Sequence, residues 1–115
     1  MKNAADTEAL DAARAARLRY VGDDTPGISR RRRGRGFSYT GPDGEPIRDE
    51  HTLERIRSLA IPPAWRDVWI CPIPNGHLQA TGRDARKRKQ YRYHPRWREV
   101  RAEAKFERVV PFSAA

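Results

Sequence analysis

The sequence lacks the features of a membrane protein and of a secreted, disulfide-bonded protein. Its 115 residues contain one cysteine, Cys71, which excludes an internal disulfide and fits a reducing cytoplasm. No run approaches the roughly 18 apolar residues that a membrane-spanning helix needs. Met1 to Leu10 holds acids and alanines where a secretory signal would be basic and then apolar. Together with a length that fits one small domain, these absences indicate a cytoplasmic protein with a single core.

Acidic residues and lysine are also scarce. The chain has 15 Asp+Glu against 24 Lys+Arg, a formal net charge of +9, and only 4 of the basic residues are lysine. Such an excess indicates a polyanionic partner, most simply nucleic acid. A G·C-rich genome would favour arginine over lysine, but it would not decide where the arginines lie.

The positive charge is concentrated in two short segments. Gly82 to Arg98 carries a net charge of +7 and Arg30 to Arg35 carries +5, whereas the remaining residues sum to −3. A slightly acidic domain with two strongly basic segments is typical of a binding surface rather than of a uniformly solvated coat.

The first half of the chain is expected to contain two helices and a short hairpin. Apolar spacing predicts a first helix from Asp6 or Thr7 to near Arg19. The arginine segment that follows is expected to be a mobile, solvated loop, because its glycines disfavour a helix. Residues 37–40 alternate as a strand, and residues 45–48 are expected to return beside it after a Gly-Pro-Asp-Gly turn.

The second helix and the rest of the sheet follow. Asp49 is expected to cap a helix that runs to about Leu59, with Leu53, Ile56 and Leu59/Ala60 on its buried side. Residues 67–71, 77–81 and 89–93 read as strands. A last helix is expected from Pro95 to near Arg108, with Trp97, Val100, Arg101 and Ala104 along one side. The predicted fold is α+β: a small antiparallel β-sheet with a few short helices.

The strongest candidate site is the basic loop before residues 89–93 and that strand itself. Long cationic side chains are suited to contact phosphates. Glutamine and arginine can also form hydrogen bonds with base edges in a DNA groove. Alternation places Tyr91 and Tyr93 on one face of the strand and Gln90 and Arg92 on the other. The candidate nucleic-acid-binding residues are Arg83, Arg86, Lys87, Arg88, Lys89, Gln90, Tyr91, Arg92 and Tyr93, together with Arg31, Arg32 and Arg33 of the other basic segment.

Two questions about these residues stay open at this point. The tyrosines either face nucleic acid or belong to the core, and one of them is expected to be mainly structural. For the arginine segment we expect nonspecific phosphate contact, because a flexible loop is poorly organised for reading bases.

The sequence offers no metal site and no catalytic constellation. Cys71 and His77 lie on neighbouring predicted strands, but a structural zinc site needs four ligands, and His51 and His94 are isolated. We therefore predict no metal or other cofactor. A tyrosine attack on a phosphodiester, as in a small nuclease, is a remote alternative because Tyr-Arg-Tyr is not a signature for a nucleophile.

Several ordered phrases carry a resemblance to a known family, from about Leu18 to Phe106. This chain resembles the N-terminal domain of bacterial type IB DNA topoisomerases, which are relatives of the poxvirus enzyme. The phrases are Leu18-Arg19-Tyr20-Val21, Pro26-Gly27-Ile28, Gly36-Phe37-Ser38-Tyr39, residues 59–65 (LAIPPAW), residues 67–72 (DVWICP), residues 76–82 (GHLQATG) and residues 88–94 (RKQYRYH).

The resemblance implies a division of labour between two domains. Enzymes of this family relax supercoils without ATP or metal, through a transient 3′-phosphotyrosine formed in a C-terminal catalytic domain. This chain has no counterpart of those catalytic residues, so the fragment alone is expected to be inactive. The implied organisation is a helical extension at 1–20, a DNA clamp domain at 21–108 and the start of a linker to the catalytic domain at 109–115.

The resemblance also implies how DNA is held by this monomeric, nucleoid-associated domain. The strand with Gln90, Tyr91 and Tyr93 would enter the major groove of double-stranded DNA, and the basic residues before it would contact phosphates. Glycine is usual in the family where this chain has Lys87, which leaves the shape of the turn open. The alternative function, from another class, is a free-standing module that prefers structured or single-stranded RNA.

Overall fold

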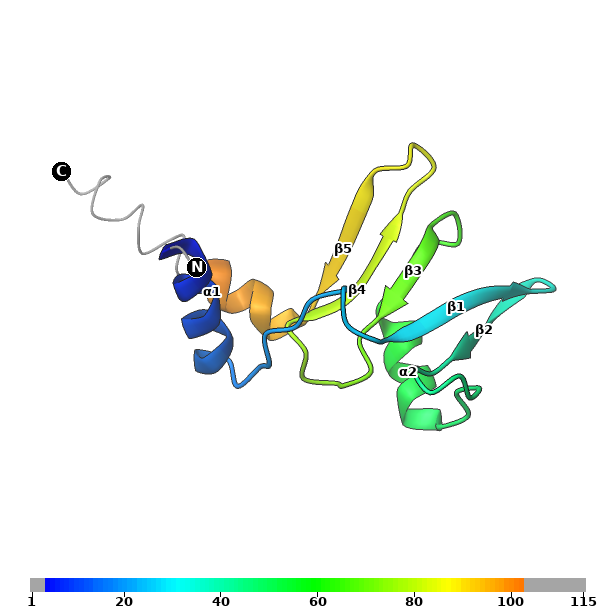
Figure 1. Ribbon diagram of the computed structural model, residues 1–115, viewed down its shortest axis with the longest axis horizontal. Coiled ribbons are helices and arrows are strands. Elements are labelled where there is room, and N and C mark those ends of the chain that lie inside the picture. The colour runs from blue at the N-terminus through cyan, green and yellow to red at the C-terminus, as the bar shows by residue number, and fades with distance from the viewer. Residues whose placement is uncertain (1–3, 103–115) are drawn as a thin grey trace.

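The chain folds into a five-stranded sheet with helices at its sides (Figure 1). The structure is a computed structural model that describes residues 4–102. Its elements are α1 (Ala4–Ala15), β1 (Ile28–Arg33), β2 (Gly36–Thr40), α2 (Glu50–Ser58), β3 (Arg66–Ile70), β4 (Leu78–Arg83) and β5 (Lys89–Tyr93). Residues 95–102 are also helical. The α+β class expected from the sequence is confirmed.

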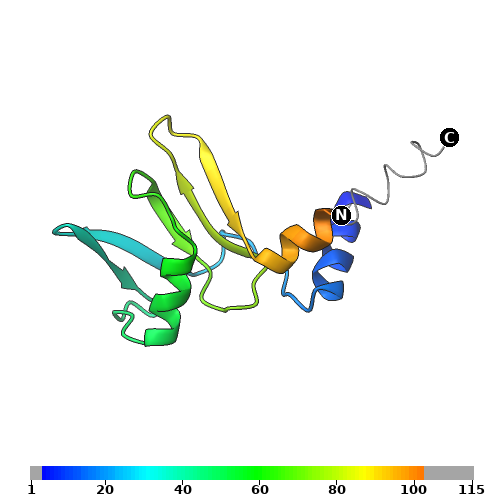
Figure 2. The same cartoon turned by 180° about the vertical axis from the view of Figure 1, so that it is seen from behind.

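All neighbouring strands in the sheet are antiparallel, in the order β2-β1-β3-β4-β5. The strands β2 and β5 therefore form its two edges. β1 pairs with β3 only at Ile28↔Ile70 and Ser29↔Trp69. Beyond those pairs the β1–β2 hairpin swings away from β3 and β4, and Figures 1 and 2 show the strands spread like a fan.

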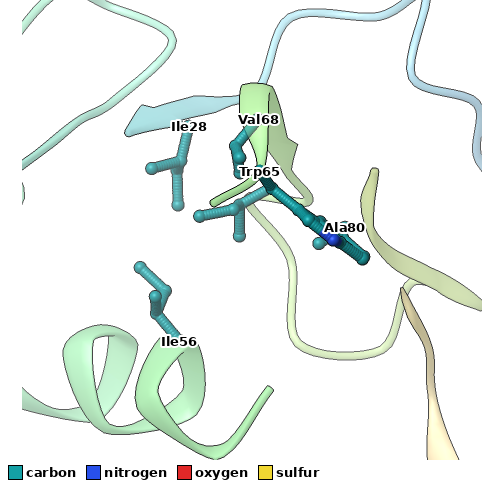
Figure 3. Packing of buried hydrophobic residues seen from close by; sticks show 6 residues of the cluster. Ile28, Ile56, Trp65, Val68 and Ala80 are labelled. Carbon is teal, nitrogen blue, oxygen red and sulfur yellow. The ribbon is translucent and has the colours of Figure 1, made fainter. Parts of the chain in front are cut away.

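The helix α2 begins and ends as expected. Asp49 accepts hydrogen bonds from the backbone N–H and the hydroxyl of Thr52, at 2.9 and 2.7 Å, which caps the first turn. Ile56 points from this helix into the core, where it meets side chains of β1, β3 and β4 and of the segment before β3 (Figure 3). The buried members of this cluster are Ile28, Ile56, Trp65, Val68, Ile70 and Ala80.

A second cluster joins the two ends of the described chain. It contains Ala13, Ala16, Leu18 and Trp97, with Tyr93 packed against it. The helix α1 ends four residues before Arg19, earlier than expected. Arg17 adopts φ 59°, and the N–H groups of Arg17 and Leu18 bond back to the carbonyls of Arg14 and Ala13. This Schellman ending turns the chain so that Leu18 is buried beside α1.

The expectation of a mobile loop at Arg30 to Arg35 is wrong, because most of this segment is strand β1. Arg32 pairs with Phe37 and Arg30 with Tyr39, and the guanidinium carbons of Arg30 and Arg32 lie 4.1 and 5.2 Å from the centre of the Phe37 ring. Gly34, at φ 59°, makes the short turn into β2. Contacts with the aromatic side chains of β2 therefore stabilise a strand in a segment whose composition predicts a loop.

The partner expected for β2 is also different. Residues 45–48 form no strand and are joined to β2 by the Thr40↔Pro46 bridge and by the hydrogen bond from Ile47 N–H to the Tyr39 carbonyl. β1 takes the place of that partner because it pairs with β2 over five residue pairs. The strands near 67–71, 77–81 and 89–93 are confirmed within two residues. The helix from Pro95 is confirmed to residue 102, and its continuation to Arg108, including Ala104, lies outside the described residues.

The packing of α2 on the sheet generates a stability prediction. The Arg55 guanidinium donates to the side-chain oxygen of Gln79 at 2.7 Å and to the Cys71 carbonyl at 2.9 Å. Arg55→Ala should lower the free energy of unfolding by about 2 kcal/mol, because both acceptors lose a charged donor. Urea denaturation followed by circular dichroism would measure the change.

The matched control lies two residues further along the same helix. Arg57 forms an exposed pair with Glu50 at 3.9 Å. Arg57→Ala should change the free energy of unfolding by less than about 0.5 kcal/mol. Equal losses in the two variants would contradict the anchoring role of Arg55.

Candidate nucleic-acid interface

The edge strand β5 presents two different faces. One face of the sheet packs against α2, and we call it the α2 face. Arg92 lies on this face because its guanidinium reaches the end of α2, and Gln90 lies there with it. Tyr91 and Tyr93 lie on the opposite face, stacked with ring centres 6.0 Å apart. The alternation predicted from the sequence is confirmed.

The two tyrosines differ in what they are free to contact. Tyr91 is 45% exposed, and the Lys89 ammonium lies 5.6 Å from the centre of its ring. Tyr93 packs beside Trp97 and His77, with ring centres 6.4 and 6.2 Å away, and burial raises the pKa of its hydroxyl. Tyr91 is therefore the tyrosine available to a ligand, while Tyr93 belongs largely to the second core cluster.

Arg92 uses its donors inside the protein. Its Nε donates to the Leu59 carbonyl at 3.2 Å and its Nη2 to the Ala60 carbonyl at 3.5 Å. Its guanidinium carbon also lies 5.1 Å from the centre of the Trp65 ring. A cation at the carboxyl end of α2 stabilises the last carbonyls of that helix. The sequence grouped Arg92 with the groove-reading residues, but the structure gives it this anchoring role.

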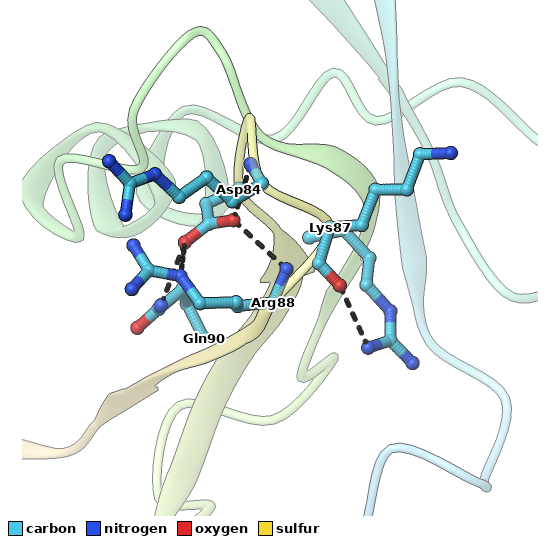
Figure 4. A network of polar contacts seen from close by, with 6 residues as sticks. Asp84, Lys87, Arg88 and Gln90 are labelled. Carbon is cyan, nitrogen blue, oxygen red and sulfur yellow. Dashed lines mark hydrogen bonds and ion pairs between the residues drawn. The ribbon is translucent and has the colours of Figure 1, made fainter.

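Asp84 organises the turn between β4 and β5 (Figure 4). Its Oδ1 accepts the backbone N–H groups of Arg86 and Arg88 at 2.8 and 2.9 Å. Its Oδ2 accepts Nε of Arg88 and Nε2 of Gln90, each at 3.0 Å. These donors, led by the Arg88 backbone, hold the pKa of the Asp84 carboxyl below its usual value. The single acid of the basic segment thus shapes the loop that carries the cations.

Lys87 adopts the left-handed backbone conformation in this turn, with φ 63°. Its N–H bonds to the Asp84 carbonyl at 2.9 Å, and the Asp84 N–H bonds to the Arg88 carbonyl at 3.0 Å. A non-glycine residue in this region costs roughly 1 kcal/mol. The turn that favours glycine is therefore present, with a lysine that adds charge at its tip.

The other cationic side chains of the turn and of β5 differ in how strongly they are bound by partners within the protein. Arg83 and Arg86 are exposed, and Arg83 makes one long hydrogen bond of 3.4 Å to the Lys87 carbonyl. The Lys89 ammonium is paired with Asp23 at 2.6 Å, and Asp23 also accepts the Thr81 hydroxyl at 2.9 Å. This pairing lowers the pKa of Asp23 and raises that of Lys89. Arg83 and Arg86 are thus freer than Lys89 to meet an anion.

The arginines of the β1–β2 hairpin also divide into bound and free. Arg30 donates at 2.9–3.3 Å to three backbone carbonyls, those of Ile61, Pro62 and Trp65. The next three arginines of the strand, Arg31, Arg32 and Arg33, are exposed. The hairpin is therefore a fixed platform for three exposed arginines, of which Arg32 also lies over the Phe37 ring.

The two basic segments, far apart in the sequence, meet at one groove. The groove has a volume of about 750 Å³ and lies where the β1–β2 hairpin diverges from β3. Its basic lining residues are Arg30, Arg31, Arg32, Arg66 and Lys87, with Phe37 and Trp65 among its walls. Sequence reasoning missed Arg66 because it stands outside both charge runs, and only the spread of the strands brings it to them. The face with Tyr91 lies on the other side of the sheet, so the candidate residues form two surfaces.

The histidine and cysteine near β4 serve packing. His77 Nδ1 accepts the Val21 N–H at 3.0 Å, and its ring stacks on Tyr20 with centres 4.2 Å apart. Burial lowers the pKa of His77 and raises that of the Cys71 thiol. Within residues 4–102, no group of three or more His, Cys, Asp or Glu side chains is placed to hold a metal ion. Over the same range, no helix has the length and apolar character needed to cross a bilayer.

Comparisons with known proteins point to one family. Residues 36–84 match the family described as the N-terminal domain of bacterial DNA topoisomerase IB. The chain is also 40% identical over 86 residues to a DNA topoisomerase 1B of Acanthamoeba polyphaga mimivirus. That match covers 75% of this chain and 26% of the viral protein, so the chain spans about a quarter of the length of this relative.

The Asp84 turn generates a prediction about pH. Because the pKa of Asp84 in the folded protein is depressed, the stabilisation it gives is complete above the ordinary pKa of 3.8 and is lost as the pH falls through the lower, folded value. In NMR spectra of the folded protein, the amide signals of Arg86 and Arg88 should therefore titrate with a midpoint below 3.8. The same signals should not show this titration in Asp84→Asn. A midpoint at or above the ordinary value would contradict the four-donor arrangement.

Proposed function

Because this chain belongs to the N-terminal domain family of bacterial type IB DNA topoisomerases, we propose that it binds double-stranded DNA as one part of a clamp. In this proposal the strand-cleaving tyrosine and its assisting residues belong to a separate catalytic domain. The parent enzyme relaxes supercoils through a transient 3′-phosphotyrosine. This domain contributes binding to the duplex and needs no cofactor.

The observation that carries the proposal is the β4–β5 ribbon with its ordered basic turn. The major groove of B-form DNA is wide enough to admit a two-stranded ribbon. β5 is an edge of the sheet, with Tyr91 exposed on one of its faces and Gln90 partly exposed on the other. Gln90 and the exposed Tyr91 then meet the groove, while Arg83 and Arg86 reach the phosphates beside it.

The β1–β2 hairpin supplies a second set of phosphate contacts. Arg31, Arg32 and Arg33 project from a strand, so they reach the backbone of the duplex from a fixed platform. Contacts of this kind give affinity without sequence preference and depend steeply on salt. Arg66, in the groove between the hairpin and the basic turn, joins this set.

The internal contacts of Arg92 and Tyr93 give them a supporting role in this proposal. Arg92 ties β5 to the end of α2, and Tyr93 ties it to the helix from residue 95. Both residues hold the strand that enters the groove. The direct contacts are left to Gln90 and Tyr91.

Salt dependence of binding tests this division between phosphate and groove contacts. Arg83→Ala and Arg86→Ala should each weaken binding to every duplex alike and lower the slope of log affinity against log salt by about 1. Gln90→Ala and Tyr91→Phe should leave that slope unchanged and alter the preference among duplex sequences. Fluorescence anisotropy at several salt concentrations measures both effects, with Arg57→Ala as the control remote from β5. The same response in all four variants would contradict the division.

Competition and activity assays test the function itself. At matched salt, double-stranded DNA should compete better than structured or single-stranded RNA for the chain. A preference for RNA would instead support a free-standing RNA-binding module. Purified chain should leave supercoiled plasmid unrelaxed, and relaxation would show that catalysis does not need a separate domain.

A further inference from the structure

The side-chain amide of Gln90 is held in one orientation by its neighbour. Its oxygen and nitrogen have nearly the same shape, so an amide is oriented by what surrounds it. A carboxylate has no hydrogen to donate, so the group that faces Asp84 Oδ2 at 3.0 Å must be the NH₂ group. The Gln90 oxygen consequently lies on the far side of the amide from Asp84, as Figure 4 shows.

Asp84 is itself fixed, so it imposes this orientation. Its side chain is 16% exposed, whereas that of Arg88, which covers it, is 63% exposed. Both carboxylate oxygens are already in use, because Oδ1 accepts two backbone N–H groups and Oδ2 accepts the Arg88 Nε beside Gln90. The donors also favour the charged carboxylate, so it stays an acceptor at neutral pH.

We propose that Asp84 is a positioning residue that makes Gln90 a hydrogen-bond acceptor toward the major groove, selective for the exocyclic amino group of adenine or cytosine. This inference rests on the proposed binding of duplex DNA. In the major groove adenine N6 and cytosine N4 are donors, whereas guanine O6 and thymine O4 are acceptors. An outward oxygen on Gln90 therefore meets adenine or cytosine favourably and opposes guanine or thymine at the same place.

Asp84→Asn inverts this arrangement with almost no change in shape. The two backbone N–H groups of Arg86 and Arg88 need an acceptor, so the amide oxygen of the new side chain takes the place of Oδ1. Its NH₂ group then faces Gln90, and Gln90 turns its oxygen inward to accept from it. The Arg88 guanidinium loses its acceptor Oδ2 and, being mostly exposed, turns to solvent. Gln90 now presents its NH₂ group outward, and the preferred bases become guanine and thymine.

The test is a selection of duplexes from a randomised pool by the whole 115-residue chain, followed by sequencing. Gln90→Ala identifies the position that Gln90 reads, because the base preference is lost there alone. At that position the unsubstituted chain should enrich adenine or cytosine on one strand, and Asp84→Asn should enrich guanine or thymine on the same strand. NMR signals of the Arg86 and Arg88 amides report whether the turn is retained in the variant.

A second measurement uses the unsubstituted chain and does not depend on the fold of Asp84→Asn. A single purine base without its amino group, placed where adenine is preferred, should weaken binding about threefold to tenfold, and 2-pyrimidinone serves where cytosine is preferred. Gln90→Ala should be indifferent to the replacement. No loss of affinity in the unsubstituted chain would overturn the inference.

The outcomes separate the inference from the function on which it rests. If duplexes bind but Asp84→Asn, with its turn intact, keeps the same base at the Gln90 position, Asp84 does not set the polarity and the inference is overturned. If duplexes bind and Gln90→Ala changes no position, the inference is also overturned while DNA binding stands. If no duplex binds, the proposed function fails and the inference fails with it.

Discussion

The carboxylate of Asp84 is the interaction on which the candidate interface depends. A segment with eight cations between Arg83 and Arg98 repels itself, and the one anion within it, Asp84, offsets part of that repulsion in the turn. By accepting from the backbone of Arg86 and Arg88, Asp84 also fixes the direction in which β5 leaves the turn. Charge and geometry are thus supplied by the same side chain, which explains how so basic a loop is ordered.

Arginine has two separate uses in this fold. One use is internal: the guanidinium groups of Arg30, Arg55 and Arg92 donate to backbone carbonyls, and that of Arg55 also donates to the buried side-chain amide of Gln79. Each planar guanidinium offers several donors, which satisfy acceptors that folding has removed from water. Others, such as Arg31 and Arg86, remain exposed. The net charge of +9 therefore overstates the charge available at the surface, because the guanidinium groups of Arg30, Arg55 and Arg92 bind acceptors within the protein.

Local patterns in the sequence predicted the elements that local physics determines. The alternation in residues 89–93 and the cap at Asp49 depend on neighbours only a few residues away, and both are confirmed. The strand at Arg30 to Arg33 was missed because its order comes from Phe37 and Tyr39 across the hairpin, and a run of like charges carries no sign of them. The internal partners of Arg92 and Lys89 were not predicted for the same reason, because α2 and Asp23 are distant from β5 along the sequence.

The two edges of the sheet show why β5 is suited to contact a ligand. An unpaired strand edge invites pairing with another chain, and proteins protect such edges by covering them or placing charges on them. At β2 the chain covers its own edge, since the Ile47 N–H donates to the Tyr39 carbonyl and the Gly41 N–H donates to the Glu45 carbonyl, on either side of the Thr40↔Pro46 bridge. At β5, within the described residues, no further strand is added, and the exposed Arg83 and Arg86 at the turn before it supply the charge instead. The charge that discourages another strand from pairing with this edge is also suited to the polyanion that we propose as its ligand, so one feature would serve both purposes.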